Sequence, residues 1–177
     1  MLLNAVLGRQ IAKVSGTPGK TRMMNVFLLP LGRGEKGEGR GGNPPLPAPL
    51  SLYFLDLPGY GYARVSQTER AAFHRLLDGV LQRPRLAGAV WLLDLRRDPS
   101  ADDHAMQDVL AAGGVRVLAA FTKADKLPRG QQRERAHALR VALHLDDEQT
   151  VSTSAKTGDG VAELREAIGE LIRKAAE

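Results

Sequence analysis

The chain has 177 residues, 43% of them hydrophobic and 25% charged, which is the composition of one ordinary soluble domain. It has no cysteine, which excludes disulfides and thiolate metal sites and fits a cytoplasmic protein, and no apolar run approaches the ~18 residues of a membrane span. The net charge of +5 favours anionic partners such as RNA, although a solvated basic surface would explain it equally well.

The first part of the chain combines a short helix, a polar stretch and a strand. Residues 2–8 predict a helix, and residues 15–21 are too rich in glycine and proline for a helix or strand interior. Residues 24–31 then predict a strand. Residues 32–49 are almost wholly glycine, proline and charged residues, so we expect a flexible hairpin insertion rather than a linker between domains. A linker there would leave too little chain before it to fold alone.

From residue 50 onward, predicted strands and helices alternate. The strands are expected over residues 50–55, 89–93, 115–121 and 150–153, and the run 89–93 is apolar enough for a strand covered on both faces. The helices are expected over residues 66–82, 100–113, 129–143 and from 159 onward, the first two opened by the capping boxes Ser66/Glu69 and Ser100/Asp103. This alternation predicts an α/β domain with a doubly wound, mostly parallel sheet, which binds ligands beyond the carboxyl ends of its strands.

An Asp-x-x-Gly motif, Asp56-Leu57-Pro58-Gly59, follows the strand 50–55. A carboxylate at a strand end can hold a magnesium-bound water, and a glycine three residues later lets a backbone N–H approach a terminal phosphate. The same pattern suits a plain turn, so the motif alone is modest evidence.

A second motif, Thr122-Lys123-Ala124-Asp125, follows the strand 115–121. The carboxylate can accept two hydrogen bonds from the Watson–Crick edge of guanine, a pattern that adenine cannot donate. The stem of Lys123 can cover the face of the base. A solvated turn before the next helix is the alternative interpretation.

A third motif, Ser154-Ala155-Lys156, follows the strand 150–153. Free backbone N–H groups here can contact the guanine carbonyl oxygen, whereas a helix-entry turn capped by Ser154 or Thr157 is the alternative. The three motifs occur in the right order, each after a predicted strand, with room for one helix between successive sites. Together they predict a guanine-nucleotide-binding fold.

The run from Asp56 to Ala63, Asp-Leu-Pro-Gly-Tyr-Gly-Tyr-Ala, resembles the signature of the EngB/YihA/YsxC family of GTP-binding proteins. Residues 15–21, 94–99 and 122–125 match the same family, so the resemblance covers essentially the whole chain outside residues 32–49. It implies a single Ras-like P-loop GTPase domain over residues 1–177. It also implies a cytoplasmic monomer that acts in assembly of the large ribosomal subunit and in normal division septation, with ribosomal RNA or a subunit precursor as partner.

The resemblance also assigns residues to the nucleotide and to Mg²⁺. Thr21 is expected to contact Mg²⁺ directly, and Asp56 through a water molecule. The residues expected to contact GTP or GDP are Gly19, Lys20, Thr21, Arg22, Met23, Asp56, Leu57, Pro58, Gly59, Thr122, Lys123, Ala124, Asp125, Thr153, Ser154 and Ala155. No residue is assigned a catalytic role.

The chain departs from this family in one respect: it lacks the Gly-x-x-x-x-Gly-Lys-Ser/Thr loop that cradles phosphates. The run Gly19-Lys20-Thr21 is not that loop, because Val14 stands where the first glycine is needed and because a strand follows. The loop and the first strand would precede Met1, so we expect a misassigned start within a longer protein. A Ras-like sheet without that central strand would have two unpaired edges.

Tyr60 takes the position where many GTPases carry a water-orienting glutamine, so hydrolysis is expected to be slow without a stimulating partner. Tyr60 and Tyr62 suit either a partner contact or local packing, and Trp91 is expected in the core. The alternative function is a nucleotide-independent RNA- or ribosome-binding module derived from the same fold. A third interpretation is a truncated product that is unstable as it stands.

Overall fold

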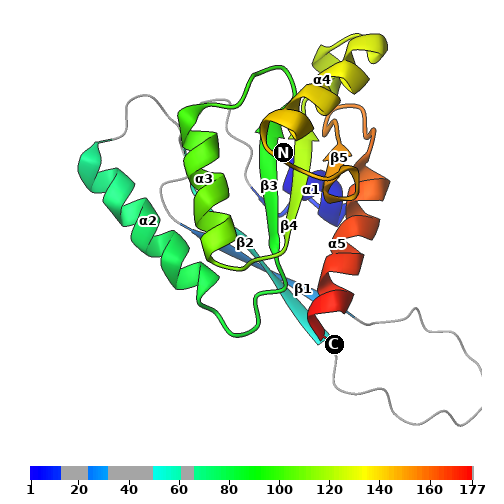
Figure 1. Cartoon of the computed structure of the whole chain (residues 1–177). Coiled ribbons are helices and arrows are strands. Elements are labelled where there is room, and N and C mark those ends of the chain that lie inside the picture. Colours follow the sequence, from blue (N-terminus) through cyan, green and yellow to red (C-terminus); the bar gives the residue numbers. More distant parts are fainter. Residues whose placement is uncertain (13–23, 32–49, 61–65, 177) are drawn as a thin grey trace, which may run out of the picture. The chain divides into compact units, whose positions relative to one another are not determined.

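The computed structural model describes residues 1–12, 24–31, 50–60 and 66–176 (Figure 1). The chain divides into two compact units, residues 15–59 and the remainder. The predictions made for residues 19–23, for the insertion 32–49 and for Tyr62 lie outside the described residues.

The smaller unit is a β-hairpin. Strand β1 (Asn25–Leu31) pairs antiparallel with β2 (Leu50–Asp56), with Asn25 opposite Asp56, so both predicted strands are confirmed to within one residue. The Asn25 amide Nδ2 donates a hydrogen bond to Asp56 Oδ2 at 3.2 Å. The hairpin therefore holds Asp56 at the point where β2 ends and the Asp-x-x-Gly motif begins.

The larger unit contains a parallel sheet of three strands in the order β3-β4-β5. These strands are β3 (Ala89–Asp94), β4 (Val117–Thr122) and β5 (Thr150–Ser152). The register places Asp94 beside Thr122 and Phe121 beside Ser152, so the three carboxyl ends meet at one edge of the sheet. The expectation of a mixed α/β fold with a parallel sheet is confirmed.

The described part of the larger unit also contains five helices and two 3₁₀ turns. They are α1 (Leu2–Leu7), α2 (Gln67–Leu81), α3 (Ala101–Ala112), η1 (Ala124–Lys126), α4 (Arg129–Ala142), η2 (Asp147–Gln149) and α5 (Val161–Ala176). Helix α3 lies between α2 and β3 in the view of Figure 1. In this same part of the chain, no helix is both long and apolar enough to cross a membrane.

Both predicted capping boxes are present. Ser66 Oγ accepts from the Glu69 N–H at 3.2 Å, and Ser100 Oγ accepts from the Asp103 N–H at the same distance. In each box the acidic side chain accepts in return from the N–H of the serine, which satisfies two backbone donors that a helix start leaves free. These contacts fix where α2 and α3 begin.

The last helix begins at Val161 and not at Asp159, so the predicted start is wrong by two residues. Gly158 and Gly160 have φ angles of +87° and +68°, a left-handed conformation that interrupts a helix. The two 3₁₀ turns were not predicted, because three residues carry too little periodicity to be recognised.

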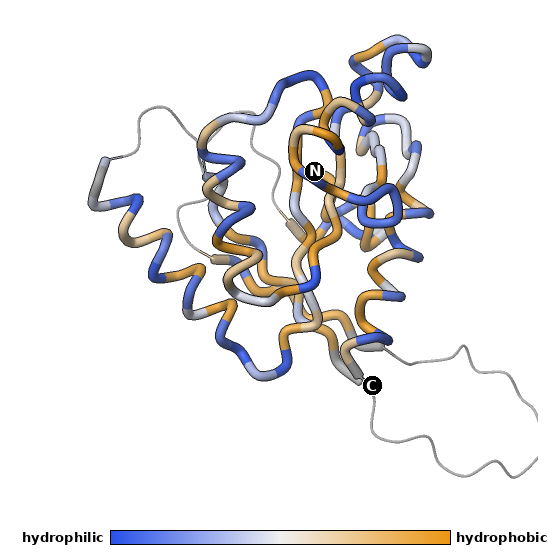
Figure 2. Tube along the Cα trace, viewed as in Figure 1, coloured by the Kyte–Doolittle hydropathy of each residue, from blue (hydrophilic) through white to orange (hydrophobic). Residues whose placement is uncertain are grey.

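The core lies along the sheet, where Figure 2 shows hydrophobic residues concentrated on β3 and β4. Phe121 and Leu95 are fully buried, and Trp91 is 4% exposed, as expected of a core residue. The expectation that residues 89–93 are covered on both faces is wrong at Leu92, which is 53% exposed. Strand side chains alternate between the two faces, so Leu92 lies on the face opposite to that of the buried Trp91 and Leu93.

The two sheets are not joined by strand pairing. Strand β2 pairs only with β1, and β3 pairs only with β4, among residues 24–31, 50–60 and 66–176. Each of these two strands thus has one edge without a strand partner in the described residues.

Candidate functional site

The loops that follow β3, β4 and β5 meet at the carboxyl edge of the parallel sheet. The Leu95 N–H donates to the Thr122 carbonyl at 3.0 Å, which ties the first loop to the second. The Ala124 N–H donates to the Thr153 carbonyl at 3.1 Å, which ties the second to the third. Two predicted site segments, 122–125 and 153–155, are therefore brought together by backbone hydrogen bonds.

The centre of this site is a contact between Asp125 and Ser154. Ser154 Oγ donates to Asp125 Oδ1 at 2.7 Å, and the serine is fully buried. The same Oγ accepts from the N–H groups of Lys156 and Thr157 at 3.2 and 3.1 Å. Ser154 therefore caps the local turn, as the alternative interpretation held, and it also orients the acidic side chain.

Asp125 is held in its ionised form. The hydrogen bond from Ser154 lowers the pKa of this carboxyl, and the cations of Lys126 and Lys156 lower it further. Lys126 Nζ lies 3.8 Å from Asp125 Oδ2, and the Asp125 side chain is 11% exposed. A fixed, ionised carboxylate at a strand end is an acceptor for two parallel N–H groups.

The turn that carries Asp125 is anchored to helix α4. Gln132 Nε2 donates to the Ala124 carbonyl at 3.0 Å and to the Leu127 carbonyl at 2.9 Å. No role for Gln132 was predicted from the sequence. Its only signal is a glutamine in the first turns of the helix directly after the motif, which is too common to identify it.

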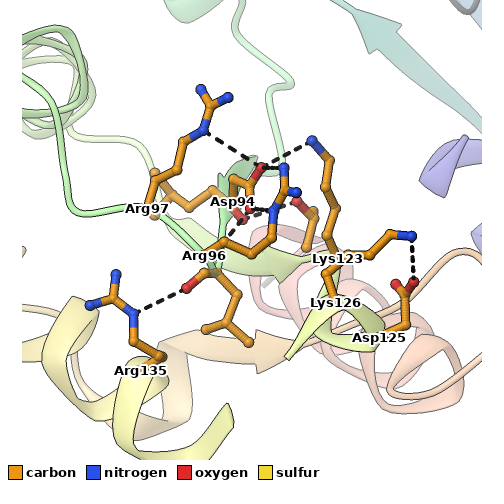
Figure 3. Close-up of polar contacts among 10 residues, drawn as sticks. Asp94, Arg96, Arg97, Lys123, Asp125, Lys126 and Arg135 are labelled. Atoms are coloured by element: carbon orange, nitrogen blue, oxygen red, sulfur yellow. Dashed lines mark hydrogen bonds and ion pairs between the residues drawn. The ribbon is translucent and has the colours of Figure 1, made fainter. Parts of the chain in front are cut away.

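A second cluster of charges surrounds Asp94 at the end of β3 (Figure 3). Arg96 binds both carboxylate oxygens, and Lys123 Nζ lies 3.0 Å from Oδ2. The hydrogen bond from Arg96 foremost, and then that from Lys123, holds the pKa of Asp94 well below its usual range. Residues 94–99 take part in the family resemblance, but no function was predicted for Asp94.

Arg135 connects helix α4 to the same loop. Its guanidinium donates to Asp98 Oδ1 at 2.9 Å and to the Leu95 carbonyl at 3.4 Å. Leu95 is fully buried, so this end of the loop is fixed by packing as well as by hydrogen bonds. Helix α4 thus supports two of the three loops.

The predicted phosphate-sensing residues lie in the hairpin unit. Asp56 ends β2, and Leu57, Pro58 and Gly59 follow it. Asp56 Oδ2 accepts from Asn25, and no hydrogen bond to Oδ1 is found among the described residues. Mg²⁺ is usually bound through one or two carboxylates together with waters and phosphates, so this single carboxylate fits a magnesium ion. No group of three or more metal-binding side chains occurs among the described residues.

An open groove of about 830 Å³ runs beside helix α4. Its polar lining includes Arg129, Arg133, Arg140, Asp147 and Asp159. It does not include Asp125 or Lys123, so it is separate from the cluster at the strand ends.

Tyr60, directly after the Asp-x-x-Gly motif, packs locally. Its hydroxyl donates to Asp103 Oδ1 at 3.0 Å and accepts from Trp91 Nε1. Burial first of all, and then the neighbouring Asp103 carboxylate, raise the pKa of Tyr60 above its usual range. Of the two predicted roles, partner contact or local packing, the structure shows the second.

Comparison with known proteins gives a consistent set of relatives. The chain is 40% identical to the "Probable GTP-binding protein EngB" of Gemmatimonas aurantiaca over 173 residues. The matched region covers 97% of this chain and 76% of that protein. The chain is 39% identical over 173 residues to the protein of the same name from Syntrophomonas wolfei, over 97% of this chain and 79% of the relative. No family model matches the chain.

The fold has a counterpart among solved structures. The crystal structure of a probable GTP-binding protein engB matches with a TM-score of 0.68, over 98% of this chain and 91% of that one. The two sequences are 17% identical, so this likeness concerns the fold.

Proposed function

Since the chain belongs to the EngB family of GTP-binding proteins, we propose that it binds GTP and GDP with Mg²⁺ and acts in assembly of the large ribosomal subunit. One observation carries the nucleotide part of this proposal. The segments 122–125 and 153–155 meet at the carboxyl edge of a parallel sheet, where Ser154 holds an ionised Asp125.

The residues of this edge supply what recognition of guanine requires. The two carboxylate oxygens of Asp125 accept from N1–H and the 2-amino group of the base. The stem of Lys123 covers one face of the base, and the backbone N–H of Ala155 donates to O6. Thr122, Ala124 and Thr153 support these groups: Thr122 Oγ1 donates to the Leu93 carbonyl at 3.1 Å, and the buried Thr153 accepts from Ala124.

The phosphate side of the proposal rests on family membership and on Asp56. Asp56 would hold Mg²⁺ through a water, Gly59 would face the terminal phosphate, and Thr21 would bind the ion directly. Gly19, Lys20, Arg22 and Met23 would line the nucleotide, and Leu57 and Pro58 would shape the turn before Gly59. When bound, Mg²⁺ neutralises phosphate charge. Hydrolysis is proposed to be slow, because Tyr60 donates to Asp103 and has no amide with which to orient a water.

The nucleotide proposal is tested by the base specificity of Asp125. Wild type is expected to bind a fluorescent GDP analogue that GTP, but not ATP, displaces. Asp125→Asn replaces one acceptor oxygen with a donor amide, so it should lose GDP and gain xanthosine diphosphate, whose C2 carbonyl accepts a hydrogen bond. Asp108→Asn, in the exposed part of α3, is the matched control and should bind GDP as wild type does.

Equal displacement of the analogue by ATP and GTP would contradict guanine specificity. So would an Asp125→Asn variant that keeps the wild-type preference for GDP over xanthosine diphosphate.

The alternative function, an RNA- or ribosome-binding module that needs no nucleotide, is favoured by the groove beside α4. Arg140 in this groove pairs with Asp147 at 2.9 Å. Arg129 and Arg133 line the same groove one helical turn apart and have no ion-pair partner in the described part of the chain. Two free guanidinium groups beside an open groove fit successive phosphates of an RNA backbone.

This second function is tested by binding of large-subunit ribosomal RNA over a series of salt concentrations. Arg129→Gln with Arg133→Gln should weaken binding and flatten its salt dependence. Arg173→Gln, in the exposed last turn of α5, should not. Binding that is identical with GTP, with GDP and without nucleotide favours the module over the switch.

Cytoplasmic location, a monomeric state, a single domain over residues 1–177 and a role in division septation are parts of the same proposal. Membership of the EngB family is the support for each of them. Gel filtration with light scattering tests the monomeric state directly.

A further inference from the structure

Asp94 is held by more cationic groups than charge balance requires. Arg96 donates from Nε to Oδ1 at 2.9 Å and from Nη2 to Oδ2 at 2.7 Å, and its backbone N–H donates to Oδ1 at 3.1 Å (Figure 3). Arg97 Nε lies farther away, at 4.0 Å from Oδ2. The Asp94 side chain is 15% exposed, so water competes little for it. These contacts fix the orientation of the carboxylate, which is a bidentate partner for Arg96.

Lys123 is fixed at both ends of its side chain. Its backbone takes the left-handed conformation, with φ 63° and ψ 32°, and its carbonyl accepts from the Lys126 N–H at 3.0 Å. Its Nζ lies 3.0 Å from Asp94 Oδ2, across from β4 to β3. A lysine held only by its backbone would lose rotamer entropy on covering a base, whereas this one is already ordered.

The two ends of Lys123 define where its stem lies. Figure 3 shows the side chain running between the turn that carries Asp125 and the carboxylate of Asp94. The side chain is 53% exposed, so its methylene groups remain available to a ligand. The apolar stem of Lys123 and the carboxylate of Asp125 together form the arrangement that a flat base with two N–H donors on one edge would fit.

We propose that Asp94 is a positioning residue for guanine binding, which holds Lys123 Nζ and so keeps the lysine stem extended beside Asp125. This inference rests on the proposed guanine-nucleotide function and gives a role to a residue that had none. Arg96 acts one step farther out, since it orients Asp94. The contribution of Asp94 passes through Lys123, so the two residues should be coupled energetically.

The coupling is measured with four versions of the full chain: wild type, Asp94→Asn, Lys123→Met and the double variant. Lys123→Met keeps a long apolar stem but removes the ammonium that Asp94 holds. Each single variant should bind the fluorescent GDP analogue about three- to tenfold more weakly, and the double variant no more weakly than the weaker single one. Asp98→Asn removes a carboxylate that binds Arg135 on the same loop, and it should change GDP affinity less than about twofold.

A second readout separates positioning from general damage to the loop. Inosine diphosphate lacks the 2-amino group, so the ratio of GDP to inosine diphosphate affinity reports the Asp125 contact alone. Asp94→Asn should weaken both nucleotides equally and leave this ratio unchanged. Should Asp94→Asn not fold, Arg96→Gln provides the same test, because it loosens Asp94 without removing it.

Additive losses in the double variant, or a changed nucleotide ratio in Asp94→Asn, would overturn the inference. If wild type binds GDP and Asp94→Asn binds it with the same affinity, only the inference about Asp94 is overturned, and the proposed function remains intact. A wild-type chain that binds no GDP would overturn the proposed function first, and this inference with it.

Discussion

Ser154 Oγ and Asp125 Oδ1 lie 2.7 Å apart, and they join the loops that follow β5 and β4. Because Ser154 is fully buried, its hydroxyl cannot exchange this partner for water. Ser154→Ala should free the Asp125 side chain to rotate and should lower GDP affinity by about tenfold, a change of ~1.4 kcal/mol. Titration with the fluorescent GDP analogue measures this loss.

The matched control is Ser152→Ala. Ser152 ends β5 two residues earlier, and no hydrogen bond of its side chain is found among the described residues. The Ser152→Ala variant should bind GDP with an affinity within about twofold of that of wild type. Equal losses for the two serine variants would contradict a specific role for Ser154.

Tyr60 stabilises the larger unit through its hydroxyl. Tyr60→Phe removes the acceptor of Trp91 Nε1, a side chain that is 4% exposed, and the donor to Asp103. A buried N–H left without a partner costs about 1–3 kcal/mol, so the free energy of unfolding in urea should fall by that amount. Tyr53→Phe is the control, since Tyr53 is 60% exposed, and it should change stability by less than about 0.5 kcal/mol. A Tyr60→Phe variant as stable as Tyr53→Phe would contradict this prediction.

The strand-and-helix pattern could be predicted from the sequence because it depends on local features. Apolar runs predicted β1, β2, β3 and β4, and the capping boxes at Ser66 and Ser100 predicted two helix starts. The ion pair of Asp94 with Lys123 could not be predicted, because 29 residues separate them and only the strand register brings them together. The same holds for Gln132, whose two acceptors are backbone carbonyls that carry no sequence signal.

Two glycines provide opposite predictions for the same substitution. Gly160 has φ +68°, and a Cβ there would lie 2.0 Å from the Ser152 carbonyl oxygen, so Gly160→Ala should destabilise the protein by about 2–3 kcal/mol. Gly79 lies within α2, where a Cβ would meet nothing within 4 Å. Gly79→Ala should therefore stabilise the protein by about 0.5–1 kcal/mol. Thermal unfolding measures both, and a shift of the same sign in the two variants would contradict the argument.

Gly160 also bears on the candidate site, because the Asp159 carbonyl beside it accepts from the Ser154 N–H at 2.9 Å. Gly160→Ala should therefore weaken GDP binding as well as stability. Gly79→Ala should change only stability. Nucleotide titration of the folded fraction of each variant distinguishes the two effects.

The stability that Asp94 contributes should depend on pH in a defined direction. Its pKa in the folded protein is lowered by Arg96 and Lys123, so folding favours the ionised form. A group with a lowered folded pKa stabilises the protein at pH values above its unfolded pKa, which is about 4 for an aspartate. This stabilisation is lost as the pH falls toward the folded pKa.

Asn cannot titrate, so the difference in unfolding free energy between wild type and Asp94→Asn should be constant from about pH 7 to 5 and should shrink below about pH 4. Urea unfolding of both chains at a series of pH values measures this difference. A difference that stayed constant down to about pH 3 would contradict an Asp94 carboxylate held by cations, because protonation would then remove nothing.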